Sequence, residues 1–275
     1  MSPPCLRPAT AADHALYSHF FAQLGLEDAP LVRGRWETEN AATTAFFVED
    51  GKEVGYAFWE LAGENAYVKH VVIDAGARGR GLGRDLMLRL AAKLRGEGAS
   101  AWRLNVMASN HVAAGLYGTL GMSTIFSTVV LRLSFENLGR LPQVPARGVD
   151  AEARFDAANE LDFGLLDGQL TRARQKLGAR IVAALSVNGK CMGVAVFDPQ
   201  YPGAFPFRCK SVEYARTLIE ALRERYEGPS SFVQLVIEDA AVVVHALESA
   251  GATRVHDILH MRGPIPRESP PIGAS

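Results

Sequence analysis

The chain has 275 residues, 48% of them hydrophobic, and its 29 basic and 30 acidic residues give a formal net charge of −1. This length allows one large domain or two of ordinary size, with enough apolar residues for a real core. The balanced charge argues against binding to nucleic acid or a membrane surface through bulk charge.

Cysteines and apolar runs set further limits. Three widely spaced cysteines, without a C-x-x-C pair or clustered histidines, predict free thiols in a reducing compartment and no metal site. The N-terminus lacks an apolar signal core, and no apolar run reaches about 18 residues. We therefore expect a cytoplasmic protein that does not span a membrane.

The first half of the chain predicts alternating strands and helices. Residues 5–10 could form a short strand, and Leu16, Phe20 and Leu24 place an apolar stripe on a helix over 13–24. Between two β-rich runs, Asp50-Gly51 is a strong hairpin turn signal. The other expected elements are strands over 44–49, 54–61, 66–73, 102–107 and 124–133, and two helices. The helix over 82–95 carries Leu82, Leu86, Leu90 and Leu94 on one face, and the helix over 110–120 has Asn110 as its expected N-cap.

The most informative stretch is RGRGLG, Arg78 to Gly83, between the strand over 66–73 and the helix over 82–95. The first N–H groups of a helix have no intrahelical partner, and glycines let a backbone approach a phosphate closely. Arg78, Arg80 and Arg84 add positive charge, so we interpret the stretch as a pyrophosphate cradle. It fits neither the Rossmann fingerprint nor the P-loop pattern, but it matches [RQ]-x-x-G-x-[GA].

A second block, NHVAAGLYGTLGM over Asn110–Met122, follows the expected strand over 102–107. In this order the two blocks resemble the pyrophosphate loop and last helix of the GNAT superfamily of N-acetyltransferases. The resemblance covers roughly residues 5–134. It implies a mixed sheet of the α/β (α+β) class, with acetyl-CoA as cosubstrate.

The second half repeats the pattern in weaker form. Residues 138–149 are expected to be a linker between a catalytic domain over 1–137 and a degenerate GNAT-like domain over 150–263, before a flexible tail over 264–275. The sequence Phe205–Val212 stands where the pyrophosphate loop should be, and Glu248 takes the place of Tyr117. We expect this domain to be structural or to shape the acceptor cleft. Its expected elements are helices over 155–177, 212–226 and 240–250, and strands over 180–187, 191–198, 232–237 and 255–261, with a turn at Asn188-Gly189.

The resemblance implies direct attack of an amine on the thioester in a ternary complex, without an acyl-enzyme. Tyr117 is the candidate general acid for the departing thiolate, because a phenol with a reference pKa of about 10 is protonated at neutral pH. A plain core aromatic is the alternative interpretation, and a buried ring can still offer its hydroxyl. The residues expected to contact the coenzyme are Val71, Val72, Ile73, Arg78, Gly79, Arg80, Gly81, Leu82, Gly83, Arg84, Asn110 and Tyr117.

The general base is harder to assign. Family members that acetylate peptide N-termini carry a glutamate where this chain has Asn105, and an amide cannot act as a base. His70 is a possible replacement, although strand alternation would place it on the opposite face from Lys69 and Val71. A water chain without a single base is also possible. Weaker candidates for the base are Glu60 and Glu64.

The acceptor is expected to be a primary amine, with a small molecule favoured over a protein; a protein lysine and an antibiotic amine both stay open. Trp36, Tyr56 and Trp59 could line its site, although each is more simply a core or surface aromatic. An alternative function, from another class of protein, is a coenzyme A-binding regulatory or sensor protein with little or no catalysis. A third possible function is acyl transfer from a longer acyl-coenzyme A. We expect a monomer or homodimer without nucleic-acid or membrane partners.

Overall fold

The computed structural model describes residues 3–25, 29–144, 148–149, 157–165, 168–175 and 179–267. The chain divides into two units. Unit 1 comprises Met1–Ile125 and Leu259–Ser275, and unit 2 comprises Phe126–Ile258. No helix among the described residues is long and apolar enough to cross a bilayer.

The sheet of unit 1 begins with four antiparallel neighbours: β1 (Cys5–Pro8), β2 (Thr44–Glu49), β3 (Lys52–Ala62) and β4 (Asn65–Ile73). At the turn between β2 and β3, Asp50 and Gly51 have φ of 48° and 76°, so the expected Asp-Gly hairpin is confirmed. β5 (Ala101–Met107) joins β4 in parallel, but the pairing stops at Val68↔Leu104.

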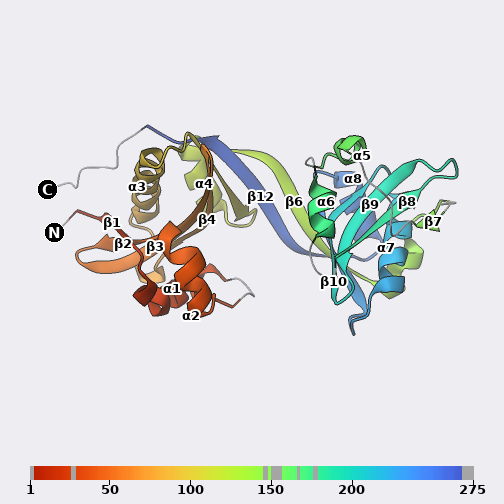
Figure 1. Ribbon diagram of the computed structural model, residues 1–275, viewed down its shortest axis with the longest axis horizontal. Helices are drawn as coiled ribbons and strands as arrows, with labels where there is room; N and C mark the ends of the chain where they lie inside the picture. The colour runs from red at the N-terminus through yellow and green to blue at the C-terminus, as the bar shows by residue number, and fades with distance from the viewer. Residues whose placement is uncertain are drawn as a thin grey trace. The chain divides into compact units, whose positions relative to one another are not determined.

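Helices cover both faces of this sheet (Figure 1). On one face, α3 (Leu82–Gly96) and α4 (His111–Thr119) share a core, in which the expected stripe of Leu86, Leu90 and Leu94 is fully buried. On the other face, α1 (His14–Phe21) packs its aromatic side chains against β2 and β3. Short helical turns flank these helices: η1 (Ala11–Asp13), η2 (Ala22–Leu24), α2 (Arg33–Arg35), η3 (Trp36–Asn40), η4 (Ala41–Thr43) and η5 (Ala75–Ala77).

Two strands carry the chain from one unit to the other: β6 (Ser123–Ser134) enters unit 2 at Phe126, and β12 (Thr253–Pro264) re-enters unit 1 at Leu259. The returning segment belongs to the core of unit 1, where Ile265 is 5% exposed and its N–H donates to the Ser100 carbonyl at 3.0 Å. The expected flexible tail is therefore wrong for Pro264 and Ile265. Residues 268–275 lie outside the described part of the chain.

Unit 2 repeats the arrangement of unit 1. Strands β7 to β10 are antiparallel neighbours, β11 pairs in parallel with β10, and β11 pairs on its other edge with β6. The elements are η6 (Phe135–Arg140), β7 (Gly148–Val149), α5 (Ala157–Asp162), α6 (Gln169–Arg174), β8 (Arg180–Leu185), β9 (Cys191–Asp198), β10 (Tyr201–Cys209), α7 (Glu213–Arg225), β11 (Phe232–Glu238) and α8 (Ala241–Ser249).

Three expectations for the second half differ from the structure. The segment expected to be a linker is part of unit 2 where it is described, because Leu138 and Leu141 are buried in its core. The helix expected over 155–177 is two short helices, α5 and α6, in its described residues. β10 was missed, because its two prolines are typical of loops and edge strands.

Candidate active site

The site begins where β4 and β5 separate. Beyond Val68↔Leu104 the two strands share no register pair, so the edge of β4 that faces β5 offers free backbone groups. The side chains of Val71 and Ile73 pack against the core under α3 and α4, and the side chain of Val72 enters the core under α1. The side chains of this segment therefore pack in the two cores, while its backbone edge has no strand partner.

A loop over residues 74–81 connects β4 to α3. The Arg78 Nε donates to the carbonyl of Ile73 at 2.9 Å, and Arg80 pairs with Glu49 at 2.9 Å. Gly79 and Gly81 have φ of 79° and 80°, and nothing lies within 4 Å of a Cβ built on either. Left-handed backbone requires glycine at these positions, and the space beside them is open.

The N-terminus of α3 faces this open space. Gly81 is the N-cap and offers no side chain, and the N–H groups of Leu82 and Gly83 have no acceptor among the residues that the structure describes. A Cβ at Gly83 would lie 3.4 Å from Leu116 of α4, and Nη1 of Arg84 lies 3.5 Å from the Thr119 hydroxyl. Unpaired N–H groups and the helix dipole are features that suit an anion.

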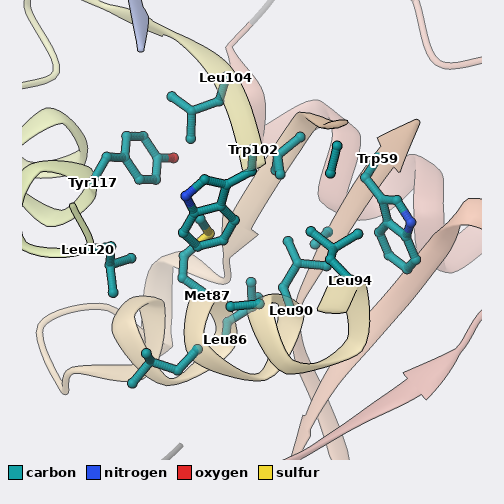
Figure 2. Packing of buried hydrophobic residues seen from close by; sticks show 14 of the residues in the cluster. Trp59, Leu86, Met87, Leu90, Leu94, Trp102, Leu104, Tyr117 and Leu120 are labelled. Carbon is teal, nitrogen blue, oxygen red and sulfur yellow. The ribbon is translucent and has the colours of Figure 1, made fainter. Parts of the chain in front are cut away.

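Tyr117 comes from α4. Asn110 is the N-cap of this helix, as expected, and the Asn110 Oδ1 accepts from the Ala113 N–H at 3.1 Å. The Tyr117 ring is 7% exposed, and its hydroxyl points toward β5 near Leu104 and Trp102 (Figure 2). Burial alone raises the pKa of Tyr117 to about 12. The hydroxyl is therefore protonated at neutral pH and able to donate.

A β-bulge determines where His70 points. The register between β3 and β4 shifts from Phe58↔His70 to Trp59↔Val68, which leaves Lys69 as an extra residue. Lys69 and His70 both approach the Phe58 ring, at 5.8 and 5.3 Å from its centroid. The expectation that His70 and Lys69 lie on opposite faces is therefore wrong, because the bulge interrupts the alternation.

The Nδ1 atom of His70 is hydrogen-bonded to the Tyr56 hydroxyl at 2.9 Å. Tyr56 is fully buried, and its hydroxyl has no other partner in the described part of the chain, so we assign its proton to this bond. Nε2 of His70 then carries the ring proton. Burial, and secondly the positive charge of Lys69, lower the pKa of His70 to about 4, so the ring is neutral at neutral pH.

The other residues considered for the base or the acceptor side are paired on the surface or buried in a core. Glu60 pairs with Lys69 at 2.5 Å, and Glu64 accepts from the Ser100 hydroxyl at 3.0 Å. The amide of Asn105 donates to the Tyr67 hydroxyl at 2.9 Å, an interaction that the sequence did not reveal. Three aromatics considered for the acceptor side are core residues with at most 1% exposure: Trp36, Tyr56 and Trp59.

The sequence model of the acetyltransferase (GNAT) family matches residues 12–122. This part of the chain is a GNAT acetyltransferase domain. The match contains β4, the loop over 74–81, α3 and Tyr117, so the site just described lies within it. GNAT proteins are acetyl-CoA-dependent acyltransferases. No curated protein sequence matches the chain.

Solved structures extend the GNAT likeness to both units. A GCN5-related N-acetyltransferase from Sphaerobacter thermophilus aligns with 98% of this chain and 99% of its own, at a TM-score of 0.63 and 16% identity. A structure titled as a putative acetyltransferase from Pyrococcus horikoshii aligns with 98% of this chain and 92% of its own, at a TM-score of 0.58 and 16% identity. A tandem GNAT protein from the clavulanic acid biosynthesis pathway aligns with 97% of this chain and 99% of its own, at a TM-score of 0.57 and 17% identity. The chain therefore has a tandem GNAT fold.

Unit 2 has other residues at the corresponding positions. In unit 1 the N–H of Met122 donates to the carbonyl of Tyr117 at 3.1 Å, and in unit 2 Ala252 donates to Leu247 at 2.9 Å. These equivalent bonds correct the expected alignment, because they place Leu247, and not Glu248, where unit 1 has Tyr117.

A cavity of about 590 Å³ lies at the start of α7, lined by residues 209–213 and 239–243.

Proposed function

We propose that the GNAT domain transfers the acetyl group of acetyl-CoA to a primary amine of a small molecule, by direct attack in a ternary complex. One observation carries the proposal: β4 and β5 separate just before the chain reaches the open N-terminus of α3, and Tyr117, whose hydroxyl has no hydrogen-bond partner among the described residues, points toward β5. A fold likeness alone would not locate chemistry.

The coenzyme would lie along this gap. The N–H groups of Leu82 and Gly83 would donate to its diphosphate, and the arginines around the loop would add positive charge. The edge of β4 at Val71 and Ile73 would hydrogen-bond the pantetheine arm as a neighbouring strand does, with the Ile73 carbonyl shared with Arg78. Asn110 already caps α4 and could contact the coenzyme only with atoms not used in that bond.

In the transfer step, the amine nitrogen forms a bond to the thioester carbonyl carbon, and the bond from that carbon to sulfur breaks. Tyr117 gives its hydroxyl proton to the sulfur and regains one from solvent. The proton lost by nitrogen passes to water. His70 suits the role of base poorly in this arrangement, because Nδ1 is already bonded and Nε2 carries a proton.

We infer that unit 2 does not bind the coenzyme. Arg208 of β10 and Glu238 of β11 form an ion pair across the position that corresponds to the open gap of unit 1. The turn before α7 contains no glycine, and Glu213 adds negative charge at the start of that helix.

Release of the coenzyme thiol from acetyl-CoA in the presence of pooled primary amines tests this function. Amine-dependent release that falls in Tyr117→Phe supports it. Coenzyme binding without release for any amine would favour the alternative, a coenzyme-binding regulatory protein, for which the amide at Asn105 is the main argument.

A further inference from the structure

The open face of β4 and β5 carries a cluster of aromatic and basic side chains: Tyr67, Lys69 and Arg103. Tyr67 and Arg103 are register partners, and the Arg103 guanidinium lies 4.9 Å from the centre of the Tyr67 ring. The Lys69 ammonium lies 5.6 Å from the same ring. Two cations therefore share one aromatic ring.

The cluster lies where the strands separate. The last pair is Val68↔Leu104, so Lys69 and Asn105 are the first residues beyond it on either strand. Asn105 donates to the Tyr67 hydroxyl at 2.9 Å, which fixes the ring and leaves the hydroxyl proton available. These side chains therefore sit beside the gap in which the thioester would be held.

The charges of the cluster do not cancel. Lys69 pairs with Glu60 at 2.5 Å, but Arg103 is exposed and has no acidic partner among the described residues. One positive charge thus remains on a guanidinium that lies over the Tyr67 ring. Such a group is suited to bind a carboxylate through two parallel hydrogen bonds.

We propose that the acceptor is an amine that also carries a carboxylate, and that Arg103, supported by Lys69 over Tyr67, binds this carboxylate beside the gap. The inference rests on the proposed function and names its substrate class. It also addresses the missing base. Nearby positive charge disfavours the ammonium form of a bound amine, so more of the acceptor is present with the free lone pair that attack requires.

The test compares proteinogenic amino acids with their primary amides, in the wild type and in Arg103→Gln. The ratio of kcat/KM for acid over amide is measured in each protein, so that the different basicity of the two amines cancels. We expect the ratio to fall at least about tenfold in Arg103→Gln, mainly through KM for the acid. An equal ratio in both proteins would overturn the inference.

Arg132→Gln is the matched control, because Arg132 also stacks on an aromatic ring, 4.4 Å from the centre of Phe232, but lies in unit 2. The ratio of kcat/KM for acid over amide in Arg132→Gln should equal that of the wild type. If no amine is turned over, saturation-transfer NMR of the same pairs with coenzyme A-loaded protein separates the two proposals. Acid-selective binding that Arg103→Gln loses keeps the carboxylate site while the proposed function fails. Binding without acid selectivity overturns the carboxylate site.

Discussion

The two units place different residues on the same framework. In both, a parallel strand pair separates after a few residues, beyond Val68↔Leu104 in unit 1 and beyond Ala204↔Leu235 in unit 2. In unit 1 a glycine-containing loop over 74–81 follows the first of these strands, whereas in unit 2 the turn spans only residues 210–212. The comparison teaches that the fold supplies a gap, and that the loop and the side chains in the gap decide whether a ligand can use it.

The last helix shows the same contrast. α4 begins with a side-chain cap and contributes Tyr117. α8 has Ala240 as its N-cap residue, without a side-chain cap, and has Leu247 in the corresponding place. Leu247 is fully buried. Unit 2 thus uses for packing a position at which unit 1 places a hydroxyl.

The largest expected effect is on coenzyme binding. Gly83→Asp places a carboxylate in the first turn of α3, where it suits the helix dipole but repels a diphosphate. Two unit charges about 4 Å apart interact by about 4 kcal/mol near a protein surface, so we expect a loss of affinity of at least about a hundredfold by calorimetry.

Gly83→Asn is the neutral control of similar shape and should lose far less affinity. Ser211→Asp makes the matching change before α7 and should leave affinity unchanged if unit 1 alone binds the coenzyme. Equal losses in Gly83→Asp and Gly83→Asn would show that crowding, and not charge, is responsible. We prefer Gly83 to Gly81, where any other residue would be strained at φ of 80°.

The second effect concerns the segment that returns to unit 1. Ile265→Ala removes a side chain that is 5% exposed in that core and should cost about 3 kcal/mol in free energy of unfolding. Urea unfolding followed by tryptophan fluorescence measures it, because all three tryptophans lie in unit 1. An unchanged midpoint would mean that the Ile265 side chain does not stabilise the core of unit 1.

A third effect depends on pH. The pKa of His70 is about 4 in the fold and about 6.5 when unfolded, so between these values the unfolded chain binds more protons. Stability should therefore fall as pH drops from about 6.5 toward 4, by about 2 kcal/mol after allowing for partial exposure. Urea unfolding at pH 7, 5.5 and 4.5 should show a flatter profile for His70→Gln, whose amide oxygen can accept from Tyr56. Parallel profiles would rule out His70 as the source.

The smallest effect is on turnover. Tyr117→Phe keeps the ring in the core and removes only the hydroxyl, so kcat should fall about tenfold while coenzyme affinity stays within about twofold. Steady-state kinetics and calorimetry on the same preparation separate the two quantities. Turnover equal to that of the wild type would leave Tyr117 as a packing residue.

Much of unit 1 could be predicted from its sequence, because local signals agree there. The leucine stripe of α3, the Asp50-Gly51 turn and the Asn110 cap all appear as expected. Three features were not visible in local signals. The return of Ile265 to unit 1 joins segments that are distant along the chain. The bulge at Lys69 and the position of β10 depend on the register between consecutive strands, which the side-chain pattern alone does not fix.

The candidate site divides in the same way. The loop glycines and Tyr117 could be read from spacing, because a helix start and a helix face are local. The cluster of Tyr67, Lys69 and Arg103 could not, because it forms only when β4 and β5 pair in one particular register. His70 was named as a base, yet its bond to Tyr56 depends on pairing between β3 and β4.

The most direct test is the number of coenzyme A molecules bound per chain, measured by titration calorimetry on the wild-type chain and on Gly83→Asp. We expect one molecule per wild-type chain and no measurable binding in the variant. Two molecules per chain, or one that survives Gly83→Asp, would contradict it.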